Sequence, residues 1–484
     1  MDFSGMKVLV MGLGLHGGGL ESARYLYRRG AELTVTDLRD EKTLAPSIEQ
    51  LDAEREGRKP IRYVLGRHDM DDFSAADIVI KNPGVRPDSP YLKAARRIET
   101  DISLFLSAAP SRITAVTGSK GKSCTTSVLH WVLARAYEEA GADAPGNAYL
   151  GGNITVSPLA FLDRLKPTDD VVLELSSWQL GDLKGRRKAC GSPLLKPRAA
   201  VLTTILPDHQ DFYGAMDPYV ADKRVIYEGQ GPDDVMVAWD DDWGSSFLAG
   251  SKAAGLTCST SPLPEGTSGG WLEDPDGPAF ARLYGRLGHG VFDGGLSELV
   301  PARPLVPGYH QKRNLLAAGL ALLGLGLSPD TVRKHLETFP GIEHRMELFH
   351  RAGGVDFYND SAATIPEAAA AALETLGRDR PLVLVTGGTD KNLDFSPLAL
   401  AAPKAKAMIL LAGSGSEKLR RMLDDAGTAY LGPFDSPDAA AAAALEVAEP
   451  GDRVALSPGC ASFGMFLNEF DRGRKWKDAV RRLG

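Results

Sequence analysis

Cysteine is scarce in this chain, and its four cysteines lie far apart. Cys124, Cys190, Cys258 and Cys460 form no Cys-x-x-Cys pair within the 484 residues. This spacing argues against a disulfide framework or a zinc knuckle, and it favours a reducing compartment. Long apolar runs are lacking as well, because the longest, residues 315–327, is too short to span a bilayer. We therefore expect a cytoplasmic protein with no export and no membrane insertion.

The chain also has no excess of basic residues. Lys and Arg number 55 against 63 Asp and Glu, which gives a net charge of −8, and no basic tract is present. Nucleic acid is therefore a poor candidate for the partner. Hydrophobic residues at 43% and charged residues at 24% are typical of a folded globular protein. A chain of 484 residues is expected to form about three domains.

The order of apolar runs and turns predicts an α/β fold. Three times, a short run rich in leucine or β-branched residues ends in a Gly-rich turn and continues into a helical pattern, as in parallel α/β units. Residues 258–295 lack this rhythm, which leaves either an antiparallel appendage or a long loop. The expected strands are 7–11, 32–36, 78–80, 113–116, 171–175, 199–203, 382–385, 407–411 and 454–457, and the clearest helices are 123–139, 315–327, 368–376 and 439–445.

The first Gly-rich turn, Gly12-x-Gly14-x-x-Gly17, follows a predicted strand and opens a helix. Asp37 lies twenty residues beyond Gly17, as in a dinucleotide-binding fingerprint, so the turn taken alone indicates NAD. The glycines allow a backbone and a helix N-terminus to approach a diphosphate, and a sugar nucleotide meets that requirement equally well. Arg39 adds a cation suited to a diphosphate.

The second Gly-rich turn, residues 118–123, reads Gly-Ser-Lys-Gly-Lys-Ser and resembles a P-loop. It follows a predicted strand and opens a helix, so its backbone amides can surround phosphate groups. Lys122 can reach the β and γ phosphates, and Ser123 can hold Mg²⁺. Val116 occupies the place of the first glycine of the complete motif. The spacing nevertheless predicts an ATP site.

Three further residues could take part in chemistry beside this turn. Glu174 ends a predicted strand, where a carboxylate could bind metal or face solvent. His209 lies between two acids, a pattern that suits either a hard metal or a surface turn. Lys223 lies on an amphipathic segment and, considered by itself, is a solvated helix lysine.

Considered together, these residues resemble the Mur ligase family of ATP-dependent amide-forming enzymes, and the resemblance covers nearly the whole chain. Beyond residues 118–123, Glu174, Asp208-His209 and Lys223, it is carried by five segments: 151–154, 176–180, His310 with Asn314, His344-Arg345 and 359–361. Residues 12–15, 394–398 and 457–463 are similar to the members that join D-glutamate to UDP-N-acetylmuramoyl-L-alanine. The family implies a Rossmann-like N-terminal domain at 1–100, a P-loop ATPase-like central domain with a mostly parallel sheet at 101–341, and a Rossmann-like C-terminal domain at 342–484.

The resemblance also implies a role for each matching residue. The implied catalytic residues are Lys122, Glu174, His209 and Lys223. The implied ligands of Mg²⁺, or Mn²⁺ in its place, are Ser123, Glu174, His209 and Lys223 as a carbamate. The implied ATP site comprises Gly118, Ser119, Lys120, Gly121, Lys122, Ser123, Cys124, Asn153, Asn314, Arg345 and Asp360. The implied UDP-sugar site comprises Leu15, Leu38, Arg39, Gly84 and Ser176, and the implied amino-acid site comprises Thr364, Lys391 and Ser462.

The expected function is ATP-dependent addition of D-glutamate to UDP-N-acetylmuramoyl-L-alanine through an acyl phosphate, in peptidoglycan precursor synthesis, by a monomeric enzyme. Ala362 stands where the D-glutamate enzymes usually carry lysine, so a sibling ligase for another amino acid is the nearest alternative. An NAD-dependent oxidoreductase would explain residues 12–37 but not Lys122, Glu174, His209 and Lys223. A binding protein switched by ATP without ligation is the third alternative.

Overall fold

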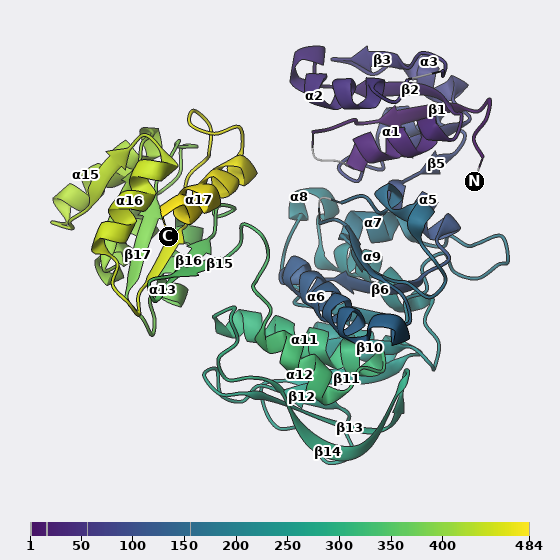
Figure 1. The fold of residues 1–484 in the computed structure, drawn as a ribbon. Coiled ribbons are helices and arrows are strands. Elements are labelled where there is room, and N and C mark those ends of the chain that lie inside the picture. The colour runs from purple at the N-terminus through teal and green to yellow at the C-terminus, as the bar shows by residue number, and fades with distance from the viewer. Residues whose placement is uncertain (1, 16–17, 56, 155, 484) are drawn as a thin grey trace. The chain divides into compact units, whose positions relative to one another are not determined.

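The computed structural model describes residues 2–15, 18–55, 57–154 and 156–483. His16 and Gly17, which belong to the first predicted turn, lie outside the described residues. The chain divides into two compact units, one of residues 1–302 and 313–336 and the other of residues 303–312 and 337–484. The first unit holds two sheets and the second holds the third (Figure 1). No helix in the described ranges is long and apolar enough to cross a membrane.

The first sheet has five parallel strands in the order β3-β2-β1-β4-β5. Every residue of β4 is buried, as expected for a central parallel strand that helices cover on both faces. The order brings the carboxyl ends of β1, β2 and β4 side by side. The elements are β1 (Lys7–Met11), α1 (Gly18–Arg28), β2 (Glu32–Asp37), α2 (Glu41–Asp52), β3 (Arg62–Leu65), α3 (Met70–Ala75), β4 (Ile78–Lys81), α4 (Pro90–Ala94), β5 (Ile98–Glu99) and α5 (Asp101–Ala108).

The second sheet has nine strands in the order β14-β13-β12-β11-β10-β9-β6-β8-β7. Pairing is parallel from β7 to β12 and antiparallel between β12, β13 and β14. Residues 258–295 therefore form an antiparallel extension of the central sheet, one of the two alternatives left by the sequence. The strands are β6 (Arg112–Thr117), β7 (Ala148–Gly152), β8 (Asp170–Glu174), β9 (Ala199–Leu202), β10 (Val235–Trp239), β11 (Ala254–Ser259), β12 (Gly269–Trp271), β13 (Ala279–Leu287) and β14 (Gly290–Val300).

Helices cover this central sheet, and the long α6 begins directly after the second Gly-rich turn (Figure 1). Residues Val128, Leu129, Val132 and Leu133 are buried along α6 at the spacing of one helix face. The helices are α6 (Lys122–Ala140), η1 (Gly141–Asp143), η2 (Pro158–Ala160), η3 (Leu162–Arg164), α7 (Ser177–Leu183), α8 (Gln210–Tyr213), α9 (Met216–Glu228), α10 (Asp242–Gly250), α11 (Tyr309–Gly324) and α12 (Pro329–Glu337).

The third sheet has the order β15-β16-β20-β17-β18-β19, and β15 pairs antiparallel at one edge. Its other pairs are parallel, so the predicted α/β class with mostly parallel sheets is confirmed. The elements are β15 (Glu347–Ala352), β16 (Val355–Asn359), α13 (Pro366–Leu376), β17 (Leu382–Thr386), α14 (Ser396–Ala401), η4 (Ala402–Lys404), β18 (Ala407–Leu411), α15 (Ser414–Asp425), β19 (Leu431–Phe434), α16 (Pro437–Val447), β20 (Arg453–Leu456) and α17 (Glu469–Leu483).

The helix α17 is attached to the third sheet by two buried side chains. Trp476 is 1% exposed, packs in an apolar cluster with Phe357 and Val454, and donates Nε1–H to the carbonyl of Tyr358 at 3.2 Å. Arg472 is equally buried and donates to the carbonyls of Ser361 and Cys460 at 2.8 and 3.0 Å. Arg472 thereby links the loop after β16 to the loop after β20.

We predict that Trp476→Ala destabilises the C-terminal unit by about 3–5 kcal/mol, because it leaves a cavity and an unpaired carbonyl. Calorimetry of the full chain should show that the C-terminal unit of this variant unfolds at a lower temperature than that of the wild type. Leu400→Ala, at a side chain that is 81% exposed, is the control and should change stability by less than about 0.5 kcal/mol. An unchanged transition in the Trp476 variant would contradict this account of the core.

Candidate active site

The loop between β6 and α6 has the geometry of a phosphate-binding turn. Gly121 caps α6 with a φ of 88°, so the first amides of the helix point out of its N-terminus. A Cβ on Gly121 would lie 2.5 Å from the side-chain oxygen of Asn314. The backbone of Ser119 bonds to Thr204 at 2.6 Å, which attaches the loop to the chain after β9. Phosphate binding through backbone amides is the chemistry that this loop can perform.

Two lysines meet at this loop. The Nζ atom of Lys122 donates to the carbonyls of Gly118 and Ser119 at 3.0 Å each, and that of Lys223 donates to Gly118 O at 2.8 Å. Lys223 is 1% exposed, and burial, together with the nearby Lys122 ammonium, lowers its pKa to about 7. A substantial fraction of Lys223 is then the neutral amine near neutral pH. The structure corrects the interpretation of Lys223 alone as a solvated helix lysine.

Glu174 lies at the end of β8, beside the loop, and is 1% exposed. Its Oε1 accepts from Asn153 Nδ2 at 2.9 Å, whereas its Oε2 is buried and has no hydrogen-bond partner among the described residues. A buried carboxylate oxygen that lacks a donor is suited to a hard cation such as Mg²⁺. This orphaned oxygen shows that the residues present fit a magnesium ion beside the loop.

His209 follows β9 and adopts a left-handed backbone with a φ of 51°. Its side chain is 43% exposed, with Nε2 4.0 Å from Asp208 Oδ1. Its ring lies against Trp178, with the ring centroids 4.7 Å apart. The carboxyl ends of β6, β8 and β9 are neighbours in the sheet, so they bring the loop, Glu174 and the His209 segment to one edge.

The other predicted ATP ligands of the first unit occupy different environments. Ser123 is half-buried in the first turn of α6, and Lys120 is exposed. Cys124 is buried on the inner face of α6, so it offers a phosphate its backbone N–H and not its thiol. Asn314 lies next to Gly121, as the close approach of its side-chain oxygen shows.

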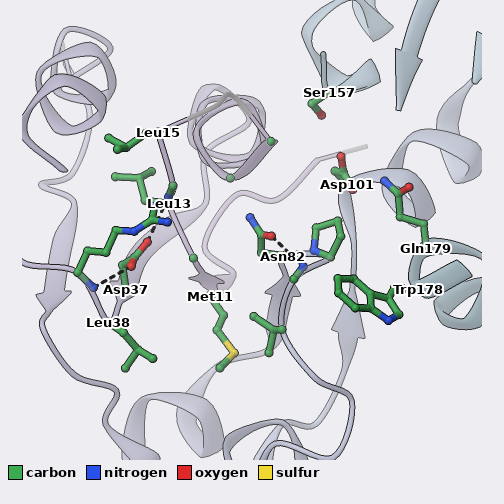
Figure 2. Close-up of a pocket in the computed structure, with 18 of the residues that line it drawn as sticks. Met11, Leu13, Leu15, Asp37, Leu38, Asn82, Asp101, Ser157, Trp178 and Gln179 are labelled. Carbon is green, nitrogen blue, oxygen red and sulfur yellow. Dashed lines mark hydrogen bonds between the residues drawn. The ribbon is translucent and has the colours of Figure 1, made fainter. Parts of the chain in front are cut away.

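A cavity of about 630 Å³ opens at the carboxyl ends of β1, β2 and β4. Four of the five predicted UDP-sugar residues line it, namely Leu15, Leu38, Arg39 and Gly84. Ser176 is not among the lining residues. It instead caps α7 together with Gln179, which does line the cavity. Figure 2 shows Leu15 and Leu38 at one end of the cavity and Trp178 and Gln179 at the other.

The Asp37 carboxylate accepts hydrogen bonds from two nearby backbone N–H groups. One oxygen accepts from Gly14 N at 3.2 Å and the other from Arg39 N at 2.9 Å (Figure 2). Asp37 therefore fixes the Gly-rich turn, which weakens the interpretation of this turn with Asp37 as an NAD site. The close packing of α1 depends on Gly19, where a Cβ would lie 2.0 Å from the carbonyl of Gly12. The fingerprint did not identify Gly19.

In the second unit, the predicted amino-acid ligands follow adjacent strands. Thr364, Ser462 and Lys391 lie beyond the carboxyl ends of β16, β20 and β17, which are neighbours in that order. The loops bond to one another, Gly459 N to Ala363 O at 2.9 Å and Thr389 N to Ala461 O at 3.0 Å. Ser462 is buried, and Lys391 is exposed with Nζ 5.9 Å from the ring centre of Phe463.

The second unit also holds Arg345 and Asp360. Arg345 lies between His344 and Met346, both with positive φ, of 65° and 46°. Asp360 accepts from Met346 N at 3.1 Å and from the Ser457 hydroxyl at 2.6 Å, and burial raises its pKa to about 6. These bonds hold the segment that carries Arg345 against the end of β16.

Five other residues that line the cavity were not among the residues predicted for the site. The cavity is also lined by Asn82, Asp101, Ser157, Trp178 and Gln179. Asn82 lies two residues before Gly84, which the resemblance does assign to the UDP-sugar site, and Trp178 and Gln179 belong to segment 176–180 of the resemblance. Asp101 and Ser157 have no local motif.

The fold and the site define a three-sheet α/β protein with a Gly-rich turn of phosphate-binding geometry after β6 and a cavity at the carboxyl ends of β1, β2 and β4. The Mur ligase MurD-like N-terminal domain matches residues 6–103, the Mur ligase middle domain matches residues 116–322, and the Mur ligase glutamate ligase domain matches residues 344–460. The chain belongs to the Mur ligase family.

Two relatives are named UDP-N-acetylmuramoylalanine–D-glutamate ligase. The protein of Roseiflexus sp. is 40% identical, and the alignment covers 100% of this chain and 99% of that protein. The protein of Treponema pallidum is 38% identical, with 99% and 98% covered. Among solved structures, the UDP-N-acetylmuramate-alanine ligase MurC of Thermotoga maritima has a TM-score of 0.55 and 18% identity, with 99% of this chain and 100% of that chain covered. MurF of the same organism, solved with ADP, has a TM-score of 0.52 and 16% identity, with 100% and 97% covered.

We predict that Gly121→Ala weakens ATP binding by about tenfold or more, since the new methyl group would displace Asn314 and strain the cap. Gly141→Ala is the matched control at the other end of α6. Its φ is also positive, at 54°, but a Cβ there meets nothing within 4 Å. Calorimetric titration should show normal ATP affinity for Gly141→Ala and a loss for Gly121→Ala. Equal affinities in the two variants would contradict the assignment of the loop.

Proposed function

We propose that this protein is an ATP-dependent ligase that joins D-glutamate to UDP-N-acetylmuramoyl-L-alanine in peptidoglycan precursor synthesis. The observation that carries the proposal is the meeting of Lys122, Lys223 and Glu174 at the phosphate loop, with Asn153 joining Glu174 to the sugar-nucleotide cavity. The full-length relatives with this named activity support the choice of substrates. We further propose that the enzyme acts as a monomer in the cytoplasm.

The proposed reaction has two bond exchanges. A carboxylate oxygen of the alanyl group attacks the γ-phosphorus of ATP, and ADP leaves. The amine nitrogen of D-glutamate then attacks the resulting acyl phosphate carbon, phosphate leaves with that carboxylate oxygen, and the amine loses a proton. A free carboxylate is a poor electrophile, so the phosphoryl group is needed as a leaving group. Most of the catalysis is then positioning and electrostatic stabilisation of the phosphoryl group.

The residues of this chain have distinct tasks in that reaction. The amides at the start of α6 and the Lys122 ammonium bind the phosphates, and Asn153 positions Glu174 beside the end of the cavity. Ser123, Glu174, His209 and Lys223 are the proposed holders of Mg²⁺, for which Mn²⁺ could substitute. When bound, this metal would neutralise negative charge on the phosphoryl group. Arg345 and Asp360 are the proposed ATP ligands of the second unit.

For Lys223 we propose a carbamate. The neutral amine nitrogen attacks the carbon of CO₂ and loses one proton, which converts a possible cation into an anion. Support comes from the burial of Lys223, its lowered pKa and the nearby unpaired Oε2 of Glu174. Two anions together suit a divalent cation better than an ammonium beside a carboxylate.

We predict that Lys223→Arg lowers kcat by about 100-fold or more, because a guanidinium keeps the charge but cannot form the carbamate. Arg224→Lys on the same helix, whose side chain bonds to Ser246 at 2.9 Å, is the control and should keep normal turnover. Carbon-13 NMR in labelled bicarbonate should show a carbamate signal in the wild type that the Lys223 variant lacks. Wild-type turnover by Lys223→Arg would overturn the carbamate.

The amino-acid preference needs a separate test, because this chain has Ala362 at a position where the D-glutamate enzymes usually carry a lysine cation. We predict phosphate release from ATP that requires both UDP-N-acetylmuramoyl-L-alanine and D-glutamate. In a panel of D- and L-amino acids, D-glutamate should exceed the others by about 100-fold in kcat/KM. Preference for another amino acid would favour a sibling ligase. ATP binding without phosphate release would favour an ATP-switched binding protein.

A further inference from the structure

Two polar side chains at the end of the cavity where Gln179 lies have no task in the proposed reaction. Asp101 is the first residue of α5, and Ser157 directly precedes η2. Both line the cavity that holds Leu38 and Arg39, yet they are only 6% and 1% exposed. Figure 2 shows the Asp101 carboxylate and the Ser157 hydroxyl turned toward one another, next to Gln179.

The Asp101 carboxylate has few partners for a buried charge. One oxygen accepts from the adjacent Ile102 N at 2.8 Å. Within the described ranges, no lysine, arginine or histidine forms an ion pair with it, and Lys81 is paired with Asp182 at 2.8 Å. Burial raises the pKa of Asp101 to about 6, and the Asp182 carboxylate acts in the same direction. Asp101 therefore retains acceptor capacity that a ligand donor could use.

The Ser157 hydroxyl is buried beside the Asp101 carboxylate and lowers the pKa of that carboxyl, but it forms no hydrogen bond of good geometry within the part of the chain that the structure describes. A buried polar group without a partner is costly, and folded proteins tolerate it mainly where a ligand or an ordered water completes the bonds. An acceptor and a hydroxyl together match a ligand group that can both donate and accept. A sugar hydroxyl has that property.

The place of the pair along the cavity indicates which part of a ligand it meets. Leu38 lies at one end of the cavity, and Asp101 and Ser157 lie at the other with Trp178 and Gln179 (Figure 2). The cavity is also lined by Asn153, which bonds to Glu174 beside the phosphate loop. The start of α1 at Gly18 also lines the cavity, and a helix N-terminus suits a diphosphate. A buried carboxylate would repel a phosphate or the reacting alanyl carboxylate but attract neutral donors.

We propose that Asp101 and Ser157 form the subsite that binds the hydroxyl groups of the hexose in the sugar nucleotide. This inference rests on the proposed function for the identity of the ligand. The carboxylate accepts from one hydroxyl, and Ser157 completes its own hydrogen bonding with the same or the adjacent hydroxyl. The pair determines how the sugar is oriented, and so how its alanyl arm approaches Asn153.

Calorimetric titration with UDP and with UDP-N-acetylglucosamine separates the hexose from the nucleotide. The wild type should bind the sugar nucleotide more tightly than UDP. Asp101→Asn should lower the affinity for UDP-N-acetylglucosamine about tenfold and leave the affinity for UDP within about twofold. Ser157→Ala should cause a smaller loss of the same kind. In turnover, both variants should raise KM for the sugar nucleotide more than KM for ATP.

A control substitution on the same helix distinguishes a loss of ligand binding from a loss of stability of α5. The Ser103 hydroxyl closes the capping box of α5 and donates to Glu99 at 2.6 Å, but it does not line the cavity. Ser103→Ala should lower the melting temperature and leave both affinities unchanged. Asp101→Asn could instead lower the affinities for UDP and UDP-N-acetylglucosamine equally, or change neither. Either result would overturn the hexose subsite alone. A wild type that binds neither nucleotide would contradict the proposed function and the subsite together.

Discussion

The register in which β8 pairs with its two neighbours governs the chemistry of the first unit. Glu174 stands opposite Val116 of β6 and opposite Gly152 of β7. Its carboxylate is therefore placed between the phosphate loop, which begins two residues after Val116, and Asn153. A slip of one residue would turn the Glu174 side chain to the other face of the sheet. The loop would then keep its phosphate-binding amides but lose the buried oxygen that suits a metal.

Charge at this site is concentrated in a few buried groups and not spread over the surface. The whole chain carries a net charge of −8, yet Lys122 and Lys223 both donate to Gly118, and burial lowers the pKa of Lys223. Two lysines this close and one unpaired carboxylate oxygen are unfavourable without ligands. In the proposed function, the nucleotide phosphates would offset the lysine charges and a divalent metal would pair with the carboxylate oxygen.

Sequence reasoning identified the parts whose signals are local. The strands β1 and β18 have the predicted bounds, and the Gly-rich turn, Glu174 and Leu38-Arg39 lie where parallel strands end. Asp101 and Ser157 could not be found this way, because an acid at the start of a helix is a common cap and an isolated serine has no pattern. They can be recognised only in the folded chain, where both side chains are buried at the wall of the same cavity. The antiparallel extension β12–β14 was ambiguous for the same reason, since its pairing depends on partners outside the segment.

In the proposed reaction, the alanyl carboxylate is phosphorylated before the amide forms. The most direct measurement uses UDP-N-acetylmuramoyl-L-alanine with oxygen-18 in that carboxylate, incubated with the full chain, ATP, Mg²⁺ and D-glutamate. Because the leaving phosphate takes one carboxylate oxygen, we expect one oxygen-18 atom in the inorganic phosphate from about half of the turnovers of a singly labelled carboxylate. For a doubly labelled carboxylate, we expect it from essentially all turnovers. Unlabelled phosphate from the doubly labelled substrate would show that water cleaves ATP, and would contradict the acyl phosphate mechanism.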